Sequence, residues 1–326
     1  MKLIDSHIVL TSTAVGGFVT VIYLLKLLTK PHKQTDFKNK HCIVTGGSSG
    51  IGKDVAKLLV QKGAHVTIIA RNLTRLEKSV EELESLTIDD SMQRISCLSL
   101  DLGNASYLEI RTKLAETEEK AGPCFALFNV AGSAVPLPLE ELDDESIEGM
   151  VKTNMLASIY ATKAVLPGMK ERREGRIVFT SSMAGMMGLF GYTAYGASKF
   201  GVRGFAEALS MEVYNYGIGV SVAFPPDTET PGFKAENALK HSVTAKISSD
   251  GSVFGSEKVA RDIVDGVSKG RFMITTGFDG WLTSLGCSGF SPTCSVVDAL
   301  LSVLVAGIVR FVALFYLHRW YNFAKK

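Results

Sequence analysis

Two short motifs in this chain carry residues whose types and spacing suit the transfer of a hydride. Residues 45–52 read TGGSSGIG, a glycine-rich turn that can hold the pyrophosphate of a dinucleotide. In the run YGASK, Tyr195 and Lys199 stand four positions apart, so a helix would place them on one face. A phenol close to an ammonium suits acid–base work on a ketone or an alcohol. We therefore predict one active site built from both motifs.

The glycine turn follows the apolar run HCIVTG and precedes a helical pattern. Gly46 and Gly50 would permit a tight turn and a close approach of the backbone to phosphate, while Gly52 would let the helix pack near the strand. The N–H groups of the first helical turn would then face the phosphate. A sharp strand-to-helix connection without a ligand is the alternative, and the position in the first strand–helix–strand unit argues against it.

The end of the second predicted strand bears on the choice of cofactor. Enzymes that use NAD usually carry an acidic residue there, which bonds the ribose 2′-hydroxyl. Here Ala70 occupies that place and Arg71 follows it, and a guanidinium suits the 2′-phosphate of NADPH. A solvated arginine at a strand end is the alternative. Asp101, at the end of the third strand, would either contact the adenine or cap a helix.

A tyrosine and a lysine at this spacing are weak evidence for an active site on their own, and Ser182 strengthens that prediction. It stands at the end of a predicted strand, thirteen residues before Tyr195, where its hydroxyl can reach the same pocket. Because a nearby cation favours phenolate, we expect Lys199 to lower the pKa of Tyr195. The apolar residues beside Ser182 form either plain core or a wall for an acyl chain. They are Met183, Met186, Met187, Leu189 and Phe190.

Short apolar runs alternate with helical patterns through the middle of the chain, and such runs are typical of parallel strands covered on both faces. They occupy residues 41–46, 65–70, 95–100, 124–130, 176–182, 218–224 and 271–277. The helical patterns include residues 52–61, 104–120, 144–169 and 194–214. The alternation predicts an α/β fold, a Rossmann-type doubly wound parallel sheet of about seven strands. Residues 225–256 show no clear pattern, and a connection this long at the carboxyl edge of a sheet is more often functional than idle.

An apolar run at residues 8–28 is about long enough to cross a bilayer, with Lys26 as its only charge. No small-residue cleavage site follows, so we expect a retained transmembrane anchor. Basic residues crowd its C-terminal side, which predicts that the domain after it faces the cytosol. They are Lys26, Lys30, Lys33, Lys38 and Lys40.

A second apolar run, residues 296–317, contains Asp298 and Arg310, so a simple lipid-facing span would be costly. We expect a re-entrant, in-plane or hairpin association with the membrane. A helix docked on the protein's own surface is the alternative. The predicted organisation is thus a membrane anchor (1–30), a cofactor-binding domain (38–277) and a membrane-associated C-terminal segment (278–326).

Composition narrows the remaining classes. With 326 residues and 46% hydrophobic content, the chain is long enough for one large α/β domain with appendages. A net charge of +2 gives no sign of nucleic-acid binding. The five cysteines lack the spacing of metal ligands, so we expect free thiols in a reducing compartment and no metal site.

These motifs together resemble the short-chain dehydrogenase/reductase family over roughly residues 38–277. The resemblance rests on Thr-Gly-x3-Gly-Ile-Gly, the run NVAG at residues 129–132, Asn154, Ser182 and Tyr195-x3-Lys199. It implies that Tyr195 donates a proton to a ketone, that Ser182 polarises the ketone oxygen, that Lys199 binds ribose hydroxyls, and that Asn154 supports a water in the proton relay. The residues expected to contact NADPH are Gly46, Ser48, Ser49, Gly50, Ile51, Gly52, Arg71, Asp101, Leu102, Asn129, Ala131, Gly132, Tyr195, Lys199, Pro225, Thr228 and Thr230.

The chain departs from the family pattern at three places. Val130 replaces the second asparagine of the usual NNAG, which concerns packing more than chemistry. Pro225-Pro226 stands where the family has Pro-Gly, so the loop beside the nicotinamide is expected to be stiffer. The family's threonine that holds the carboxamide corresponds to Thr230.

Within the family, residues 169–178, 188–195 and 225–233 and the apolar segments at both ends resemble the animal 3-ketodihydrosphingosine reductases. This resemblance implies NADPH-dependent reduction of a long-chain lipid ketone in sphingolipid synthesis, at the cytosolic face of the endoplasmic reticulum membrane. A membrane reductase of steroids, retinoids or 3-ketoacyl-CoA is one alternative, and a non-catalytic cofactor-binding scaffold is another. Family members often pair through helices like residues 144–169 and 194–214, so a homo-oligomer is compatible with the resemblance.

Overall fold

A parallel sheet forms the centre of this computed structural model, which describes residues 20, 22–24, 34–89 and 92–325. Among the described residues the sheet has seven strands in the order β3-β2-β1-β4-β5-β6-β9, and every pair is parallel. The strands are β1 (His41–Thr45), β2 (His65–Ala70), β3 (Ile95–Ser99), β4 (Cys124–Asn129), β5 (Gly175–Thr180), β6 (Ile218–Phe224) and β9 (Met273–Thr275). The predicted Rossmann-type sheet is therefore confirmed. The seventh strand is shorter than expected.

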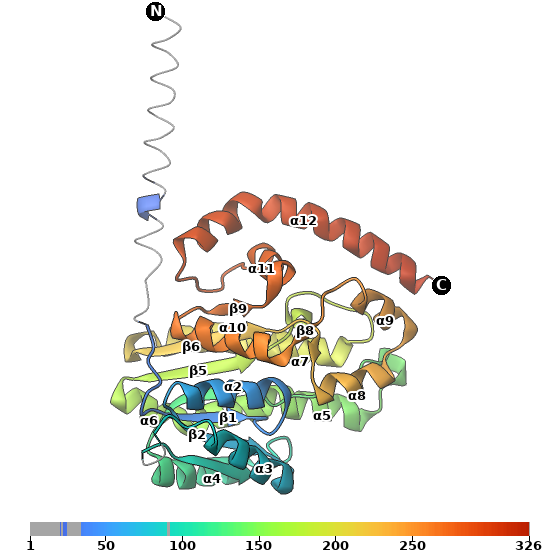
Figure 1. Ribbon diagram of the computed structural model, residues 1–326. Coiled ribbons are helices and arrows are strands. Elements are labelled where there is room, and N and C mark those ends of the chain that lie inside the picture. The colour runs from blue at the N-terminus through green and yellow to red at the C-terminus, as the bar shows by residue number, and fades with distance from the viewer. Residues whose placement is uncertain (1–19, 21, 25–33, 90–91, 326) are drawn as a thin grey trace, which may run out of the picture.

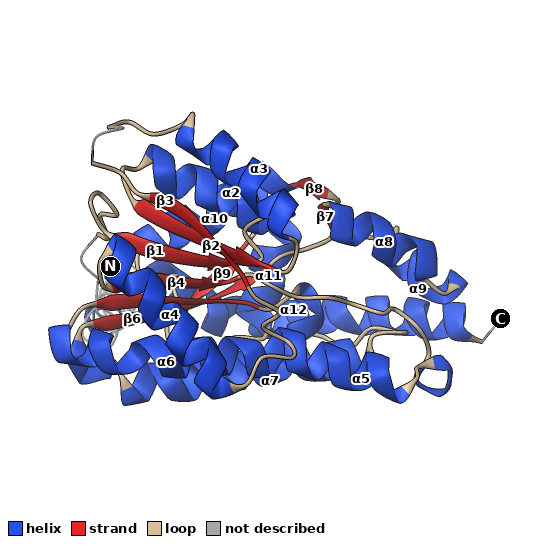
Figure 2. Cartoon of the chain, turned by 90° about the horizontal axis from the view of Figure 1, so that it is seen from below, coloured by secondary structure: helices blue, strands red, loops and turns tan. Residues whose placement is uncertain are grey.

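Helices cover both faces of this sheet, as Figure 2 shows. One face carries α2 (Gly50–Gln61), α3 (Leu73–Glu84) and α10 (Ser256–Ser268), and the other carries α4 (Tyr107–Ala121), α6 (Ala157–Arg172) and α7 (Thr193–Glu212). Each layer has its own buried apolar cluster, because alternate strand residues such as Ile43 and Val44 point to opposite faces. The chain order reverses between β1 and β4, and ligands of doubly wound sheets bind outside the carboxyl ends of the strands at such a point.

The helix expected at residues 144–169 is divided in the structure. It consists of α5 (Asp144–Val151), a π-helical turn at Lys152–Leu156 and α6. A π turn contains an extra residue relative to an α-helical turn, and such turns occur frequently at functional sites. This one contains Asn154, which is almost fully buried. Periodicity alone could not reveal the turn, because the apolar pattern runs through it.

The patternless stretch after β6 folds into small elements at the carboxyl edge of the sheet. They are β7 (Thr228–Glu229), α8 (Pro231–Leu239), α9 (Ser242–Ser248) and β8 (Phe254–Gly255), with β7 and β8 paired in parallel. Thr230 caps α8 by accepting a hydrogen bond from the N–H of Phe233 at 3.0 Å, and Pro231 takes the first helical position. Short 3-10 turns elsewhere comprise Leu139–Glu141, Met183–Gly185 and Tyr214–Tyr216.

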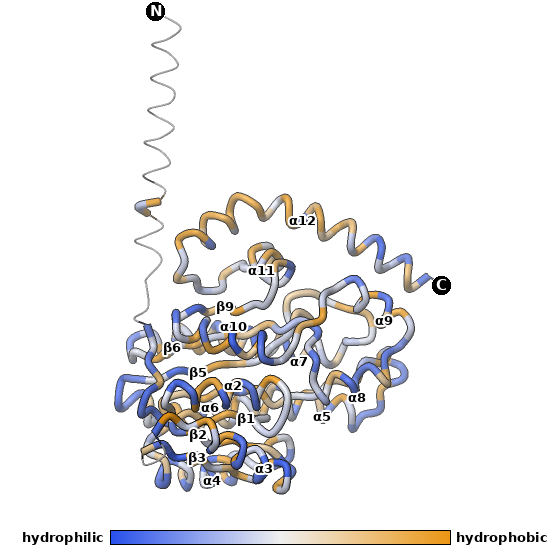
Figure 3. The backbone as a smooth tube through the Cα atoms, viewed as in Figure 1, coloured by the Kyte–Doolittle hydropathy of each residue, from blue (hydrophilic) through white to orange (hydrophobic). Residues whose placement is uncertain are grey.

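Two helices follow the sheet, α11 (Gly277–Gly286) and α12 (Val296–Ala324). In Figure 1, α12 lies across α11 and extends to α9. Figure 3 shows hydrophobic residues along most of α12 and hydrophilic residues towards its C-terminal end. Among the described residues it is the helix long and apolar enough to cross a membrane, and no part of its apolar stretch is buried. The anchor expected at residues 8–28 lies outside the described residues, apart from Thr20 and residues 22–24.

Candidate active site

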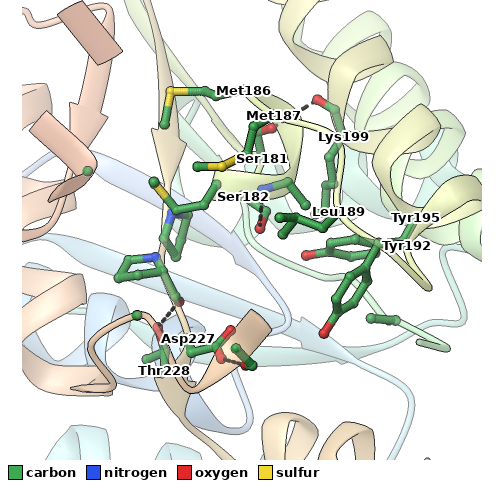
Figure 4. Close-up of a pocket in the computed structure, with 18 of the residues that line it drawn as sticks. Ser181, Ser182, Met186, Met187, Leu189, Tyr192, Tyr195, Lys199, Asp227 and Thr228 are labelled. Carbon is green, nitrogen blue, oxygen red and sulfur yellow. Dashed lines mark hydrogen bonds between the residues drawn. The ribbon is translucent and has the colours of Figure 1, made fainter. Parts of the chain in front are cut away.

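A cavity of about 1110 Å³ opens at the carboxyl ends of the strands, beneath α12. It brings together the glycine turn and the Tyr-Lys pair, two motifs far apart in the sequence. Figure 4 shows Ser182, Tyr195 and Lys199 gathered in this cavity. The predicted residues that line it are Gly46, Ser49, Gly50, Ile51, Gly52, Arg71, Ala131, Gly132, Ser182, Tyr195, Lys199, Pro225, Thr228 and Thr230. Five predicted residues do not line it: Ser48, Asp101, Leu102, Asn129 and Asn154.

The glycine turn has the shape that a phosphate group needs. Gly46 and Gly50 have positive φ angles of +69° and +52°, which side-chain-bearing residues rarely adopt. A Cβ on Gly52 would stand 2.4 Å from the carbonyl oxygen of Gly46, so only glycine lets α2 begin this close to β1. Ser49 precedes α2, and its side chain makes no capping hydrogen bond. The first N–H groups of α2 are thus left to bind an anion, and this cradle fits a dinucleotide pyrophosphate.

Thr45 fixes the glycine turn against the end of β4, a role that the sequence did not reveal. Its hydroxyl accepts hydrogen bonds from the N–H groups of Val130 at 3.0 Å and Ala131 at 3.1 Å. A Cβ on Gly46 would lie 3.0 Å from Ala131, so the two segments touch through their backbones. A hydroxyl at the last position of a strand before a glycine turn is the signal that could have indicated this role.

The helix α7 holds Tyr195 and Lys199 on one face, as the spacing predicted. The Lys199 ammonium lies 5.6 Å from the centroid of the Tyr195 ring and donates a 2.8 Å hydrogen bond to the carbonyl oxygen of Thr180. Burial lowers the pKa of Lys199 to about 8. Ser182 stands at the start of a 3-10 turn, where its hydroxyl accepts a hydrogen bond from the N–H of Ala184 at 3.2 Å. It also hydrogen-bonds Tyr195.

The prediction that the pKa of Tyr195 is lowered is wrong for this structure, in which it is raised. Burial raises the pKa of Tyr195, the hydrogen bond with Ser182 opposes the rise, and the negative charges of Glu236 and Asp227 add to it. Desolvation penalises the phenolate, and it outweighs any attraction to the Lys199 ammonium. Tyr195 is therefore a neutral phenol at neutral pH, which is the form that can donate a proton.

Asn154 stands behind the cavity wall and is fixed by three hydrogen bonds. Its Oδ1 accepts from the N–H of Ser133 at 2.8 Å, and its Nδ2 donates to the Ser133 carbonyl at 2.9 Å and to the Ser198 hydroxyl at 3.0 Å. A Cβ on Gly132 would lie 3.0 Å from Asn154 Oδ1 and 3.3 Å from Lys199 Nζ. Asn154 and Lys199 therefore converge on the same glycine.

Arg71 and Asp101 were both expected near the adenosine end of the cofactor, and only Arg71 lines the cavity. Arg71 is exposed and lines the cavity, and among the described residues its guanidinium has no hydrogen-bond or salt-bridge partner. It is free to bind a phosphate group. Asp101 instead accepts hydrogen bonds from the N–H of Gly103 at 3.1 Å and from the side chain of Asn104 at 3.0 Å. Its carboxylate stabilises the turn after β3, whereas the cap of the next helix, α4, is Ser106, so neither of the two roles expected for Asp101 is seen.

Apolar side chains form the part of the cavity beyond Ser182. All five residues that were expected to be either core or wall line it: Met183, Met186, Met187, Leu189 and Phe190. The inner side of α12 completes this wall with Val309, Val312, Ala313 and Leu317. The cavity thus has an apolar region next to the Tyr-Lys pair, which a hydrocarbon chain can fill.

Comparisons with known proteins agree with this geometry. The short chain dehydrogenase family matches residues 40–240. A 3-ketodihydrosphingosine reductase from Bos taurus is 41% identical over 310 residues, covering 95% of this chain and 92% of the relative. A 3-dehydrosphinganine reductase from Danio rerio is 42% identical over 301 residues, covering 92% of this chain and 90% of the relative.

Similarity extends to plants and to a solved structure. The 3-dehydrosphinganine reductase TSC10B of Arabidopsis thaliana is 35% identical over 313 residues, covering 94% of this chain and 91% of that protein. A short-chain dehydrogenase from Sphingobium yanoikuyae, solved in complex with NADPH, superposes with a TM-score of 0.63. It shares 24% sequence identity and covers 72% of this chain and 87% of its own, which supports the fold. This chain belongs to the short-chain dehydrogenase family, and within it to the group of the 3-ketodihydrosphingosine reductases.

Proposed function

We propose that this protein reduces the ketone of 3-ketodihydrosphingosine to the alcohol of dihydrosphingosine with NADPH, a step of sphingolipid synthesis. The observation that carries the proposal is the cavity itself. It joins a phosphate-binding turn, a free guanidinium at Arg71, the pair of Tyr195 and the buried Lys199, and an apolar wall. Relatives that are 41% and 42% identical over nearly the whole chain bear the corresponding name. The catalytic domain comprises residues 38–277, between the anchor and the C-terminal segment.

The residues act on the two ends of the cofactor and on the ketone. The N–H groups at the start of α2 hold the pyrophosphate, and Arg71 holds the 2′-phosphate. NADPH, when bound, supplies the hydride. Tyr195 donates its proton to the ketone oxygen, and its raised pKa keeps that proton in place at neutral pH. Ser182 donates a hydrogen bond to the same oxygen and stabilises the negative charge that develops there.

Lys199 and Asn154 support the proton donor. The Lys199 ammonium binds ribose hydroxyls and stabilises the phenolate that remains after proton transfer, because a cation lowers the energy of a nearby anion. Asn154 lies next to Lys199 across Gly132, so a water held there would return a proton from solvent to Tyr195.

The decisive experiment is NADPH oxidation by the purified full chain with a panel of ketones. The panel contains 3-ketodihydrosphingosine, shorter 3-ketosphingoid bases, a steroid ketone and a 3-ketoacyl-CoA. We expect the highest kcat/KM with 3-ketodihydrosphingosine. Each methylene removed from a buried chain should lower kcat/KM about fourfold, from about 0.8 kcal/mol per methylene. A higher kcat/KM for the steroid or the acyl-CoA would refute the sphingoid assignment and leave only the broader reductase activity.

We also propose that α12 lies in the plane of the endoplasmic reticulum membrane, on its cytosolic side. Near its start, Asp298 accepts a 3.3 Å hydrogen bond from the indole of Trp281, and near its end Arg319 forms a 2.7 Å salt bridge with Asp250. Trp281 belongs to α11 and Asp250 to the connection between α9 and β8, so a helix crossing the bilayer would break one of these contacts. Its outer face carries apolar residues that are more than half exposed, among them Phe311 and Phe315. Such a face suits the boundary between headgroups and acyl chains.

Two measurements on the full chain in sealed vesicles test this placement. A photolabel confined to the acyl region should label Phe311 and Phe315 and leave Met211, an equally exposed side chain on α7, unlabelled. Protease added outside endoplasmic reticulum vesicles should cut the region around Tyr195. Unlabelled α12 would contradict the in-plane helix, and protection of the Tyr195 region until detergent is added would reverse the topology.

A further inference from the structure

Two carboxylates line the cavity beside the proposed proton donor, and the proposed reaction does not use them. Asp227 follows β6, and Glu236 lies on α8. Glu236 accepts a hydrogen bond from the Tyr192 hydroxyl, and the rings of Tyr192 and Tyr195 lie 5.5 Å apart. Figure 4 shows Asp227, Tyr192 and Tyr195 among the side chains that line the cavity. The carboxylates are thus close to the point where the ketone oxygen would bind.

One lysine partly neutralises these carboxylates from behind. Lys240 has a side chain that is only 4% exposed, and it does not line the cavity. Its ammonium lies 3.5 Å from a carboxylate oxygen of Asp227 and 3.5 Å from one of Glu236, and it donates a shorter 2.9 Å hydrogen bond to the Ser248 hydroxyl. Two carboxylates and one ammonium leave one net negative charge, and it faces the cavity.

The buried surroundings make a negative charge costly at this place. Burial raises the pKa of Glu236, the bonds from Tyr192 and Lys240 oppose the rise, and the charge of Asp227 adds to it. Lys199, a cation on the cavity wall, directs its ammonium to the carbonyl of Thr180. A ligand cation would therefore find a matching charge here, since an isolated buried charge is costly and a paired one is not.

We infer that Asp227 and Glu236 form the recognition site for the amine of the sphingoid base and determine specificity for amino ketones. The inference rests on the proposed function. In 3-ketodihydrosphingosine the amine is on the carbon next to the ketone, so a ketone bound at Tyr195 places the ammonium in the same corner of the cavity. Ketones of steroids and acyl-CoA have no cation at this position. The site thus selects among long-chain ketones by charge, and the apolar wall selects by length.

The test compares two ketones that differ only in the amine. One is 3-ketodihydrosphingosine, and the other is the ketone of the same chain length that keeps the hydroxymethyl group and lacks the amine. Kinetics with NADPH are measured for the full-length wild type, Glu236→Gln, Asp227→Asn and the control Glu229→Gln. Glu229 is exposed, lies in the same segment and does not line the cavity.

The wild type should prefer the amino ketone. In Glu236→Gln and Asp227→Asn, kcat/KM for the amino ketone should fall about 10- to 100-fold, the range for losing a charged hydrogen bond, while kcat/KM for the ketone without the amine should change far less. Glu229→Gln should keep the wild-type preference. An unchanged preference in both carboxamide variants would overturn the inference. Equal losses for both ketones with intact NADPH binding would overturn it too, since they indicate a purely structural network around Lys240.

A measurement on the wild type alone covers the case in which the variants do not fold. The substrate here is the ketone that lacks the amine. A long-chain primary amine should inhibit its reduction at least about tenfold more strongly than an alcohol of the same length, and a tenfold ratio corresponds to about 1.4 kcal/mol of binding free energy. Equal inhibition would overturn the amine site. If the wild type reduced neither ketone, the proposed function itself would fall. If it reduced both with equal kcat/KM, only the amine site would fall.

Discussion

Replacing Tyr195 with phenylalanine separates the chemistry of this site from its stability. The substitution removes one hydroxyl and keeps the ring, so the 5.5 Å contact with the Tyr192 ring remains. The lost hydrogen bond to Ser182 costs about 1 kcal/mol of unfolding free energy, because the Ser182 hydroxyl keeps its bond from the N–H of Ala184. For a domain of this size that amounts to a decrease in Tm of about 2–4 °C.

The loss of turnover should be much larger than the loss of stability. Removing a general acid costs about 10²- to 10⁴-fold in rate, which corresponds to about 2.7–5.4 kcal/mol of barrier. The assay measures NADPH oxidation with 3-ketodihydrosphingosine, NADPH binding by fluorescence and thermal unfolding. Tyr160→Phe is the matched control, since Tyr160 packs against the Tyr107 ring at 6.0 Å and does not line the cavity.

The expected result for Tyr195→Phe is a collapse of kcat with nearly unchanged NADPH binding and Tm. Turnover within threefold of the wild type would show that another group donates the proton. Parallel losses of turnover, binding and Tm would show that the hydroxyl is structural. Tyr160→Phe should match the wild type in all three measurements.

The other predictions concern the cofactor and the buried lysine. Arg71→Asp should weaken NADPH binding by at least about 10-fold and leave NADH binding nearly unchanged, because repulsion of the 2′-phosphate replaces a charged hydrogen bond. Titration of each variant with both cofactors measures these affinities, and Arg75→Asp is the control, since Arg75 is exposed and does not line the cavity. An unchanged NADPH affinity in Arg71→Asp would refute the prediction. The pKa of Lys199 is about 8 when folded, against an ordinary value of 10.5, so the unfolded chain binds more protons between these pH values. The contribution of Lys199 to stability should therefore rise with pH there by up to about 1.4 kcal/mol per pH unit, so in urea titrations the free energy of unfolding of Lys199→Met should have a pH slope lower than that of the wild type by up to this amount; equal slopes for both proteins would contradict it.

Much of the fold could be predicted because its signals are local. The buried strands are continuous apolar runs, and all seven appear within two residues of their predicted ends. The glycine turn and the Tyr-Lys pair are short motifs whose geometry follows from their own sequence. Placing both at the carboxyl edge needed only the rule that parallel strands end on the same side.

The features that were missed depend on contacts between distant segments. Glu236 and Lys240 are ordinary surface-type residues in the sequence, and only the folding of α8 against Tyr192 brings Glu236 to the cavity, with Lys240 behind it. The raised pKa of Tyr195 likewise results from burial and from carboxylates that lie more than thirty residues away in sequence. The spacing of a tyrosine and a lysine cannot predict that balance, because desolvation depends on everything that covers the phenol.

The arrangement of polar and apolar walls fixes the orientation of the proposed substrate. The carboxylates of Asp227 and Glu236 line the cavity together with Tyr195, so the polar head of the substrate would bind beside them. The apolar wall is formed by residues such as Met186 near Ser182 and by α12 from Val309 to Leu317. A sphingoid ketone has this asymmetry, since its carbonyl is near the polar end and its long chain begins on the other side. The chain would then leave the catalytic centre along the inner face of α12, the helix whose outer face is apolar and exposed. A substrate dissolved in the membrane could thus enter with its chain in contact with apolar surface throughout.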